Sequence, residues 1–264
     1  MVKFVSVEEA RAASGLRLVL AGNIPSPWSE AAKGCFDVKG IDYLGVRQRI
    51  GDVETRAWTG HHNAPVAMFG AEPPLTNWAD ILALAERLAP SPSLLPVGES
   101  DRVQMFGLSH ELLGPDGLAW STRLLMVHAG LTTDGARGFP TRAASYLAAK
   151  YGYAPDRIDG ARARIAAVLG ALGERLSGGR DYLVGDHFSA ADIHAVAAMG
   201  ILQPLPEELC PTLPVFRHAC ETIDDDVKAL VPPVLRAHRD RIYQRHLTLP
   251  VTCWARRSSR PREE

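Results

Sequence analysis

The chain has 264 residues, of which 46% are apolar and 22% are charged, and its formal net charge at pH 7 is -1. This length and composition are typical of a globular protein with a sizeable core, which needs neither a metal nor a disulfide for stability. The nearly balanced charge argues against a nucleic-acid-binding protein and against one held electrostatically on an anionic membrane.

No segment has the pattern of a signal peptide, and no apolar run approaches the length of a membrane span. We therefore expect a cytoplasmic protein that does not contact a membrane. The cysteines lie far apart and without paired spacing, at positions Cys35, Cys210, Cys220 and Cys253. This spacing favours reduced thiols and predicts neither a disulfide framework nor a metal site.

Strand and helix patterns alternate over the first 89 residues and predict the order β-α-β-α-β-α. In chain order, these predicted elements cover residues 16–21, 28–40, 43–46, 66–69 and 76–88. The polar stretch at 52–62 supplies the remaining helix and predicts either a short helix or an irregular loop. Pro74 and Leu75 leave room for at most a stub of a fourth strand. This alternation predicts a small α/β domain over residues 1–89.

The composition changes after residue 89. Three prolines with serines and a glycine between them predict a linker at 90–98. Beyond the linker the patterns are helical, most clearly at 158–176, where apolar residues form one stripe. We expect an all-helical domain over 99–250 and a flexible tail over 251–264.

One segment of the second half carries a strong helix-start signal. Ser189 fits an N-cap, and Asp192, three residues on, closes a capping box that accounts for both side chains. Phe188 and Ile193 occupy the two positions of a hydrophobic staple. A capping signal alone identifies only the start of a helix. Together with the preceding run YLVGDHF, at 182–188, the segment becomes a much more specific sequence motif.

Three separated segments together resemble the glutathione transferase family. They are Ser26-Pro27-Trp28-Ser29 at a strand-to-helix turn, Asn63-Ala64-Pro65-Val66 before a strand, and the capped segment at 183–193. Residues 211–216 show a weaker similarity to the segment that starts the next helix in this family. The resemblance implies a thioredoxin-like N-terminal domain followed by an all-helical C-terminal domain, and it implies a homodimer.

Ser26 stands immediately before Pro27, and proline is favoured at the first position of a helix. One interpretation is that the Ser26 hydroxyl only caps the helix. The other, which the resemblance supports, is that this hydroxyl and the positive helix end face the thiol of bound glutathione. A free thiol with a pKa of about 8.5 is mostly protonated at neutral pH, whereas a donor beside a helix N-terminus favours the reactive thiolate. Ser26 is therefore the predicted catalytic residue.

The resemblance also implies how the cysteinyl part of glutathione is bound. The family has a cis-proline at the position of Pro65, which exposes the backbone of Ala64 to that part of the ligand. An ordinary trans-proline at the start of a strand is the alternative.

The γ-glutamyl part of glutathione meets an acidic residue and a serine in this family. In one register these positions fall on Asn77 and Trp78, and in the next on Thr76 and Asn77. Trp78 does not replace a serine hydroxyl, so this departure bears on the affinity for glutathione. The predicted glutathione-binding residues are Ser26, Trp28, Ala64, Pro65, Thr76 and Asn77.

Several other side chains have competing interpretations. Trp58 either walls the glutathione pocket or anchors its own loop. His61 and His62 either contact a ligand carboxylate or are solvated loop residues, and the sequence favours the second interpretation. Cys35 lies on the apolar face of the first helix, which favours a buried and unreactive thiol. Four residues either line the electrophile site or pack in the helical core: Gln104, Met105, Leu108 and Trp120.

Two functions remain open. An enzyme would use glutathione as cosubstrate, stabilise its thiolate through Ser26 and direct it to a small apolar electrophile. The alternative is a non-catalytic binding or scaffolding protein with the same fold, which the departure at Asn77 and the extension past Leu230 motivate. A thiol-disulfide oxidoreductase is disfavoured because its chemistry needs a cysteine where Ser26 stands.

Overall fold

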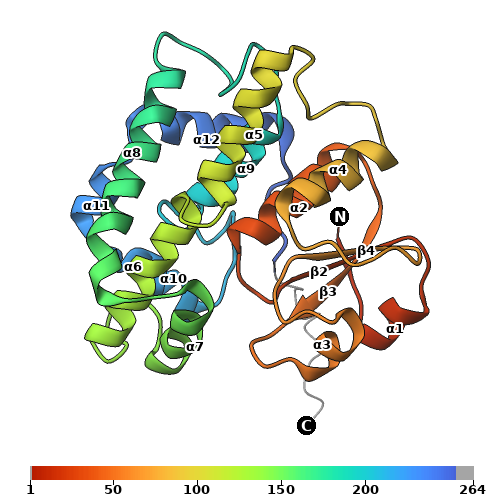
Figure 1. Cartoon of the computed structure of the whole chain (residues 1–264), viewed down its shortest axis with the longest axis horizontal. Coiled ribbons are helices and arrows are strands. Elements are labelled where there is room, and N and C mark those ends of the chain that lie inside the picture. The colour runs from red at the N-terminus through yellow and green to blue at the C-terminus, as the bar shows by residue number, and fades with distance from the viewer. Residues whose placement is uncertain (1, 254–264) are drawn as a thin grey trace.

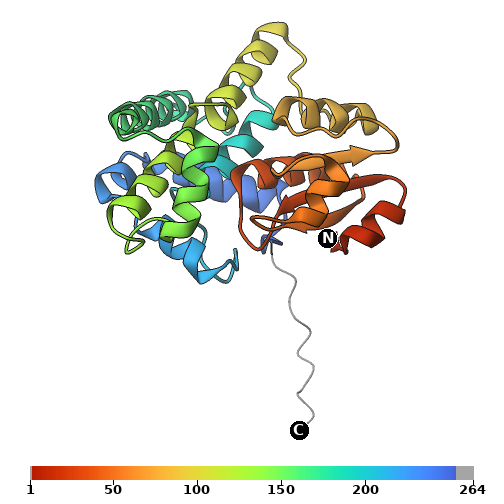
Figure 2. The same ribbon diagram turned by 60° about the horizontal axis from the view of Figure 1, so that its bottom comes forward.

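The computed structural model describes residues 2–253 and shows a small sheet beside a larger group of helices (Figure 1). In chain order the elements are β1 (Lys3–Phe4), α1 (Val7–Ala12), β2 (Leu16–Ala21), α2 (Pro27–Val38), β3 (Tyr43–Gln48), α3 (Val53–Thr59), β4 (Val66–Phe69), α4 (Trp78–Leu88), α5 (Glu99–Leu113), α6 (Leu118–Thr132), α7 (Thr141–Tyr151), a 3-10 turn (Pro155–Arg157), α8 (Ile158–Leu176), α9 (Ala190–Met199), α10 (Pro214–Glu221), α11 (Asp225–Ala229) and α12 (Pro233–His246). The sheet with α1 to α4 forms one half of the molecule, and the later helices form the other, as the turned view also shows (Figure 2). This is the predicted thioredoxin-like domain with an all-helical partner.

The sheet has the strand order β1-β3-β2-β4. Strands β1 and β2 run parallel to β3, and β4 runs antiparallel to β2, with Val19 opposite Val46 on one side and Val66 on the other. Beyond β4 the chain adds a single antiparallel bridge between Ala67 and Leu75. This bridge is the predicted stub of a further strand.

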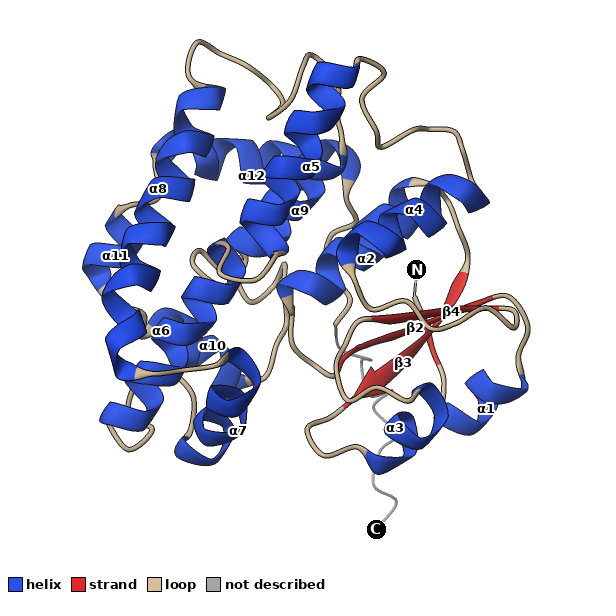
Figure 3. Cartoon of the chain, in the orientation of Figure 1, coloured by secondary structure: helices blue, strands red, loops and turns tan. Residues whose placement is uncertain are grey.

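Side chains along β2 point alternately to the two faces of the sheet, and each face is covered by a different pair of helices. Leu16, Leu18 and Leu20 pack in the cluster that contains the apolar faces of α2 and α4. Val19 points the other way and packs with α1 and with Trp58 of α3. Successive strand residues point to opposite faces, so the mostly apolar run of β2 reflects burial on both sides, with helix pairs above and below the sheet (Figure 3).

Two elements precede those predicted from the sequence. Strand β1 has two residues and α1 has six, which is too short for a periodic apolar signal. Helix α1 depends instead on a capping box, in which the Glu9 N–H donates to Ser6 Oγ and the Ser6 N–H donates to Glu9 Oε2.

The linker after α4 is fixed to α2 by one buried cation. The Lys39 ammonium forms an ion pair with Glu86 at 2.8 Å and donates hydrogen bonds to the carbonyl oxygens of Ala89 (2.6 Å) and Pro92 (2.7 Å). The side chain of Lys39 is fully buried. Because the two carbonyl oxygens lie at the end of α4 and in the linker, this contact holds the beginning of the linker against α2.

Helix α9 lies at the centre of the helical half, and all ten of its residues are buried. Its start is held by the buried Asp192 carboxylate, which accepts hydrogen bonds from the N–H groups of Leu183 (2.9 Å) and Ser189 (3.0 Å). The same carboxylate accepts a hydrogen bond from His238 Nε2 of α12 at 2.9 Å. The expectation that capping accounts for Asp192 is therefore incomplete, because Asp192 also joins α9 to α12.

The two halves of the molecule meet where α2 crosses α9. A Cβ atom at Gly34 would lie 2.5 Å from Cγ2 of Ile193, so only glycine fits this approach without a shift. Among residues 2–253, no helix is both long and apolar enough to cross a membrane.

The described chain ends by packing against the segment between α9 and α10. Val251 and Cys253 are buried in a small cluster with Leu205 and Cys210. These residues open the segment predicted as a flexible tail, and its remainder, 254–264, lies outside the described residues.

Candidate functional site

A cavity of about 390 Å³ lies between the sheet half and the helical half. Its sheet-side wall comes from segments 21–28, 48–50 and 62–64, which are the ends of β2 and β3 and the approach to β4. Its helical wall comes from α6, from α7 with the two residues before it, and from the start of α10. Thus the strand-to-helix turn that carries Ser26 meets the helical half across an open space.

Ser26 lies on the sheet-side wall, directly before α2. Its carbonyl oxygen accepts the Glu30 N–H at 2.8 Å, which starts the helix. A serine at this position normally caps the helix through its side chain, but the Ser26 hydroxyl makes no capping hydrogen bond. Because this residue lines the cavity, its hydroxyl is available to a molecule bound there, beside the positive end of α2.

The segment before β4 lies on the same wall. The Ala64–Pro65 peptide bond is cis, as the resemblance implied. Ala64 lines the cavity, whereas Pro65 is buried and does not. No hydrogen bond within residues 2–253 uses the backbone N–H or C=O of Ala64, so its peptide groups are also available to a ligand. His62 is exposed and lines the cavity as well.

Trp28 joins the two walls. Its indole Nε1–H donates to the carbonyl oxygen of Leu113 at 2.7 Å, and its ring stacks on Tyr151 with centroids 5.8 Å apart. The ring also lines the cavity. Trp28 therefore offers a ring surface to a ligand, since its only N–H donor is already used by α5.

Thr76 and Asn77 are not brought to this cavity. Both are exposed, and Asn77 Oδ1 accepts the Ala79 N–H at 2.8 Å, so its side chain caps α4. Trp78 turns into the protein, where its ring packs against Phe106 and His194. In neither register do these residues meet Ser26 in the cavity.

The helical wall uses residues that the sequence patterns did not single out. Arg123 of α6 and Lys150 of α7 line the cavity, together with a set of aromatic side chains: Phe139, Tyr146, Tyr151 and Phe216. None of the four helical residues expected at an electrophile site lines it: Gln104, Met105, Leu108 and Trp120. Met105 and Leu108 are buried in the core instead.

The cavity has a positive character. No Asp or Glu of residues 2–253 lines it, whereas Arg49, Arg123 and Lys150 do. Burial, followed by repulsion from Arg123, lowers the pKa of Lys150 to about 8. Such a wall favours anionic ligands.

A buried chain of polar side chains lies elsewhere, between α2, α5 and α9. Cys35 Sγ is 3.9 Å from His194 Nε2, and His194 Nδ1 is 2.8 Å from Ser109 Oγ. Burial raises the pKa of the Cys35 thiol to about 12 and lowers the pKa of His194 to about 3. A protonated thiol and a neutral imidazole do not form a nucleophilic pair, so this cluster is structural, as expected for Cys35.

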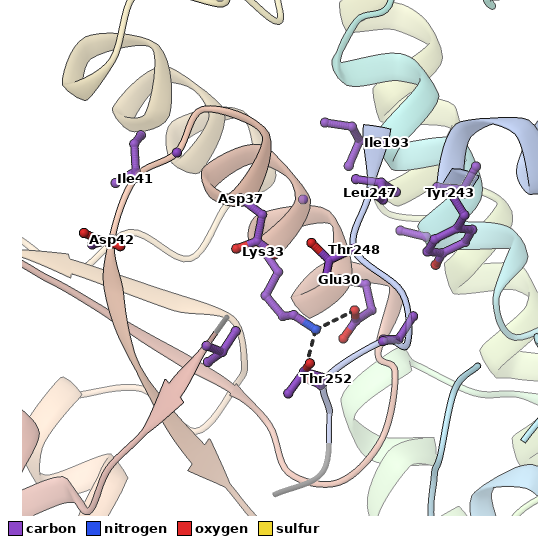
Figure 4. Close-up of a pocket in the computed structure, with 16 residues that line it drawn as sticks. Glu30, Lys33, Asp37, Ile41, Asp42, Ile193, Tyr243, Leu247, Thr248 and Thr252 are labelled. Atoms are coloured by element: carbon purple, nitrogen blue, oxygen red, sulfur yellow. Dashed lines mark hydrogen bonds and ion pairs between the residues drawn. The ribbon is translucent and has the colours of Figure 1, made fainter. Parts of the chain in front are cut away.

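A second cavity, of about 180 Å³, lies between α2, α9, α12 and the segment at 247–252 (Figure 4). Its main polar contact is the buried Lys33 ammonium, which pairs with Glu30 at 2.8 Å and donates to the carbonyl oxygen of Thr252 at 3.0 Å. Burial raises the pKa of Glu30 although Lys33 opposes this shift. These groups satisfy one another and anchor the end of the described chain, so we assign them a structural role.

Within residues 2–253, no group of three or more His, Cys, Asp or Glu side chains is arranged to hold a metal ion. Trp58, for which two roles were open, packs against the apolar cluster between the sheet and α1 and does not line the cavity. It anchors its own segment.

A family model and several solved structures match parts of this chain. Residues 144–220 match the family model of the glutathione S-transferase C-terminal domain. A search of curated proteins finds no match. Among solved structures, a glutathione S-transferase from Methylobacterium radiotolerans in complex with glutathione sulfonate is 22% identical, with a TM-score of 0.58 over 87% of this chain and 91% of that one.

Two further structures are similar over most of their length. A β-etherase from a Sphingobium species is 19% identical, with a TM-score of 0.62 over 88% of this chain and 96% of that one. A glutathione transferase family member from Pseudomonas fluorescens, with two glutathione molecules bound, is 15% identical, with a TM-score of 0.60 over 92% of this chain and 98% of that one. Likenesses at this level of identity establish the fold.

Proposed function

Because the chain has the glutathione transferase fold and carries that family's C-terminal domain, we propose that it is a glutathione-dependent transferase whose active site is the cavity at Ser26. Glutathione lies along the sheet-side wall, with its thiol against the Ser26 hydroxyl and its cysteinyl backbone paired with Ala64. The acceptor lies on the helical side. Trp28 supplies a ring surface between the two ligands.

The proposed reaction uses the thiol as a nucleophile. The thiol proton passes to solvent, and the Ser26 hydroxyl donates a hydrogen bond to the resulting thiolate. A sulfur lone pair then forms the new sulfur–carbon bond, while the leaving group departs with the electron pair of the bond that breaks. The balance is one glutathione and one acceptor R–X giving the conjugate and HX. No covalent bond to the protein forms.

The single observation that carries this proposal is the unused hydroxyl of Ser26 at the N-terminus of α2, in a cavity shared with the free peptide edge of Ala64. A hydroxyl that only capped the helix would be engaged by a backbone N–H one turn on. The donor and the helix dipole both stabilise a thiolate more than a thiol, which is what activation requires.

The γ-glutamyl part of glutathione is where the proposal departs from the resemblance. Thr76 and Asn77 lie at the start of α4 and outside the cavity, so we expect a modest affinity for glutathione. Arg49 and His62 are exposed at the cavity, and we expect them to bind the glycine carboxylate of glutathione.

Two measurements test this function. Isothermal calorimetry with glutathione measures binding, and conjugation of a chlorodinitrobenzene is followed by absorbance. Binding in the millimolar range or tighter, together with conjugation that saturates in glutathione, is expected. Binding without conjugation of any aryl halide or conjugated alkene would favour the alternative, a non-catalytic binding or scaffolding protein. The homodimer implied by the resemblance remains a prediction, which sedimentation velocity tests.

A further inference from the structure

Arg123 is an unusual residue for the middle of α6. It is 3% exposed, and it lies between the rings of Phe139 and Phe216, whose centroids are 5.3 and 5.1 Å from the guanidinium carbon. No hydrogen bond or ion pair within residues 2–253 involves its guanidinium, and its Nε is buried without a partner. A guanidinium keeps its charge and offers five donors, and a buried charge is normally paired. Arg123 lines the cavity, so a ligand can supply that partner.

Lys150 is the second cation on this wall. It projects from α7 beside the ring of Tyr151, with its ammonium 5.5 Å from the ring centroid. Lys150 and Arg123 line the same cavity, and burial, followed by the charge of Arg123, lowers the pKa of Lys150. Since no Asp or Glu of the described chain lines the cavity, no carboxylate there neutralises these two charges. A bound anion would neutralise them.

The surroundings of the two cations indicate what carries the anion. Phe139 and Phe216 flank Arg123, and Tyr146 and Tyr151 line the remaining helical side of the cavity, with Trp28 facing them from the sheet side. Aromatic side chains pack favourably against a flat ring. A carboxylate matches the planar fork of a guanidinium, because its two oxygens accept two parallel hydrogen bonds.

We propose that the acceptor substrate is an aromatic carboxylate, whose carboxylate binds Arg123 and Lys150 and whose ring lies among the aromatic side chains of the helical wall. This inference rests on the proposed function, since it names the partner of glutathione in the same cavity. Arg123 and Ser26 lie on opposite walls, so the ring spans the space between the anion and the reacting carbon. This acceptor differs from the apolar electrophile expected from the sequence, because it carries an anionic group beside its aromatic ring.

The test uses two unreactive acceptor mimics that share one ring, 3,5-dinitrobenzoate and 3,5-dinitrobenzamide, in which the neutral amide replaces the carboxylate. Their dissociation constants are measured by calorimetry on the full chain, with and without glutathione. The wild-type protein is expected to bind the benzoate at least about 10-fold more tightly than the benzamide. Equal affinities, or no binding of either compound at millimolar concentration, would overturn the inference.

Variants locate the preference. Arg123→Met is expected to remove the preference for the benzoate over the benzamide, and Arg123→Lys is expected to retain part of it. Lys150→Gln is expected to lower the ratio of the two affinities by about 3- to 10-fold. Arg142→Met removes an exposed cation of α7 outside the cavity and is expected to change neither affinity. A preference that survives Arg123→Met would overturn the inference. If circular dichroism shows that Arg123→Met is unfolded, Lys150→Gln decides.

Glutathione binding separates this inference from the proposed function. If glutathione displaces the benzoate competitively and its own affinity falls in Arg123→Met, the cations serve glutathione and the inference is wrong. If glutathione and benzoate bind together, the inference is supported. If glutathione does not bind but the charge preference persists and depends on Arg123, the anion site stands and only the proposed transferase function is refuted.

Discussion

Replacement of Ser26 by alanine tests the proposed thiolate contact. A hydrogen bond to a charged group contributes about 1.5–3 kcal/mol, and a pKa change of one unit corresponds to about 1.4 kcal/mol. Ser26→Ala is therefore expected to raise the pKa of the thiol of bound glutathione by about 1 to 2 units. The rate of conjugation near neutral pH is expected to fall about 10- to 100-fold. The pH dependence of kcat, measured at saturating glutathione, reports this pKa.

The same substitution is expected to leave stability almost unchanged. Loss of a helix cap usually costs about 1 kcal/mol, but the Ser26 side chain caps nothing. The free energy of unfolding from urea denaturation should therefore change by less than about 0.5 kcal/mol. The proposed function therefore predicts that the substitution lowers activity without lowering stability, because the Ser26 hydroxyl makes no capping hydrogen bond.

Ser29, one turn away in α2, is the matched control. Its hydroxyl is buried and accepts the Ala21 N–H at 3.0 Å. Ser29→Ala leaves that N–H unpaired and is expected to cost about 1–3 kcal/mol of unfolding free energy, with no change in the pKa of bound glutathione. If Ser26→Ala destabilises the protein as much as Ser29→Ala does, and the pH dependence of kcat stays the same, the role assigned to Ser26 is wrong.

Three further predictions concern stability and are measured by urea denaturation. Lys39→Met leaves the half-buried Glu86 carboxylate and two carbonyl oxygens without their cation and is expected to cost about 3–5 kcal/mol. A loss below about 1 kcal/mol would show that this contact does not hold the linker. Gly34→Ala places a methyl group against Ile193 and should cost about 1–3 kcal/mol of unfolding free energy. Gly170→Ala, on the exposed side of α8 with open space around it, should be neutral or stabilising. Equal effects of the two substitutions would contradict the close crossing of α2 and α9. Burial lowers the pKa of His194, so the unfolded chain binds a proton that the folded protein excludes. The free energy of unfolding is therefore highest above pH 6.5 and falls by about 1.4 kcal/mol per pH unit below that value. His194→Gln should flatten this dependence between about pH 7 and 5, and an unchanged slope would contradict the role of His194.

The fold was predictable where apolar periodicity is strong. The run at β2 and the stripe at α8 begin and end at the predicted residues, because burial of a whole strand or helix face imposes a regular pattern. Helix α12 escaped prediction because only three of its residues are buried, Leu235, His238 and Ile242. One of these is the histidine that pairs with Asp192, and the two apolar residues, Leu235 and Ile242, are too few to give a periodic signal in the sequence.

The site was predictable only on its sheet side. Ser26 and Ala64 belong to turns whose local chemistry is visible in the sequence, and the structure places both on one cavity. The helical wall is assembled from α6, α7 and the start of α10, which lie far apart in sequence, so no local spacing reveals it. One signal was present, because Arg123 stands alone within the apolar stretch of α6. A single charge in a buried helix indicates either a pair or a ligand.

Titration of the bound thiol tests the central claim most directly. The absorbance of the glutathione thiolate is followed against pH in the wild-type complex, and again with free glutathione in the same buffer. If the Ser26 hydroxyl and the α2 N-terminus stabilise the thiolate, the bound thiol has a pKa at least about one unit lower than the free thiol. A bound thiol that titrates like free glutathione would contradict the account.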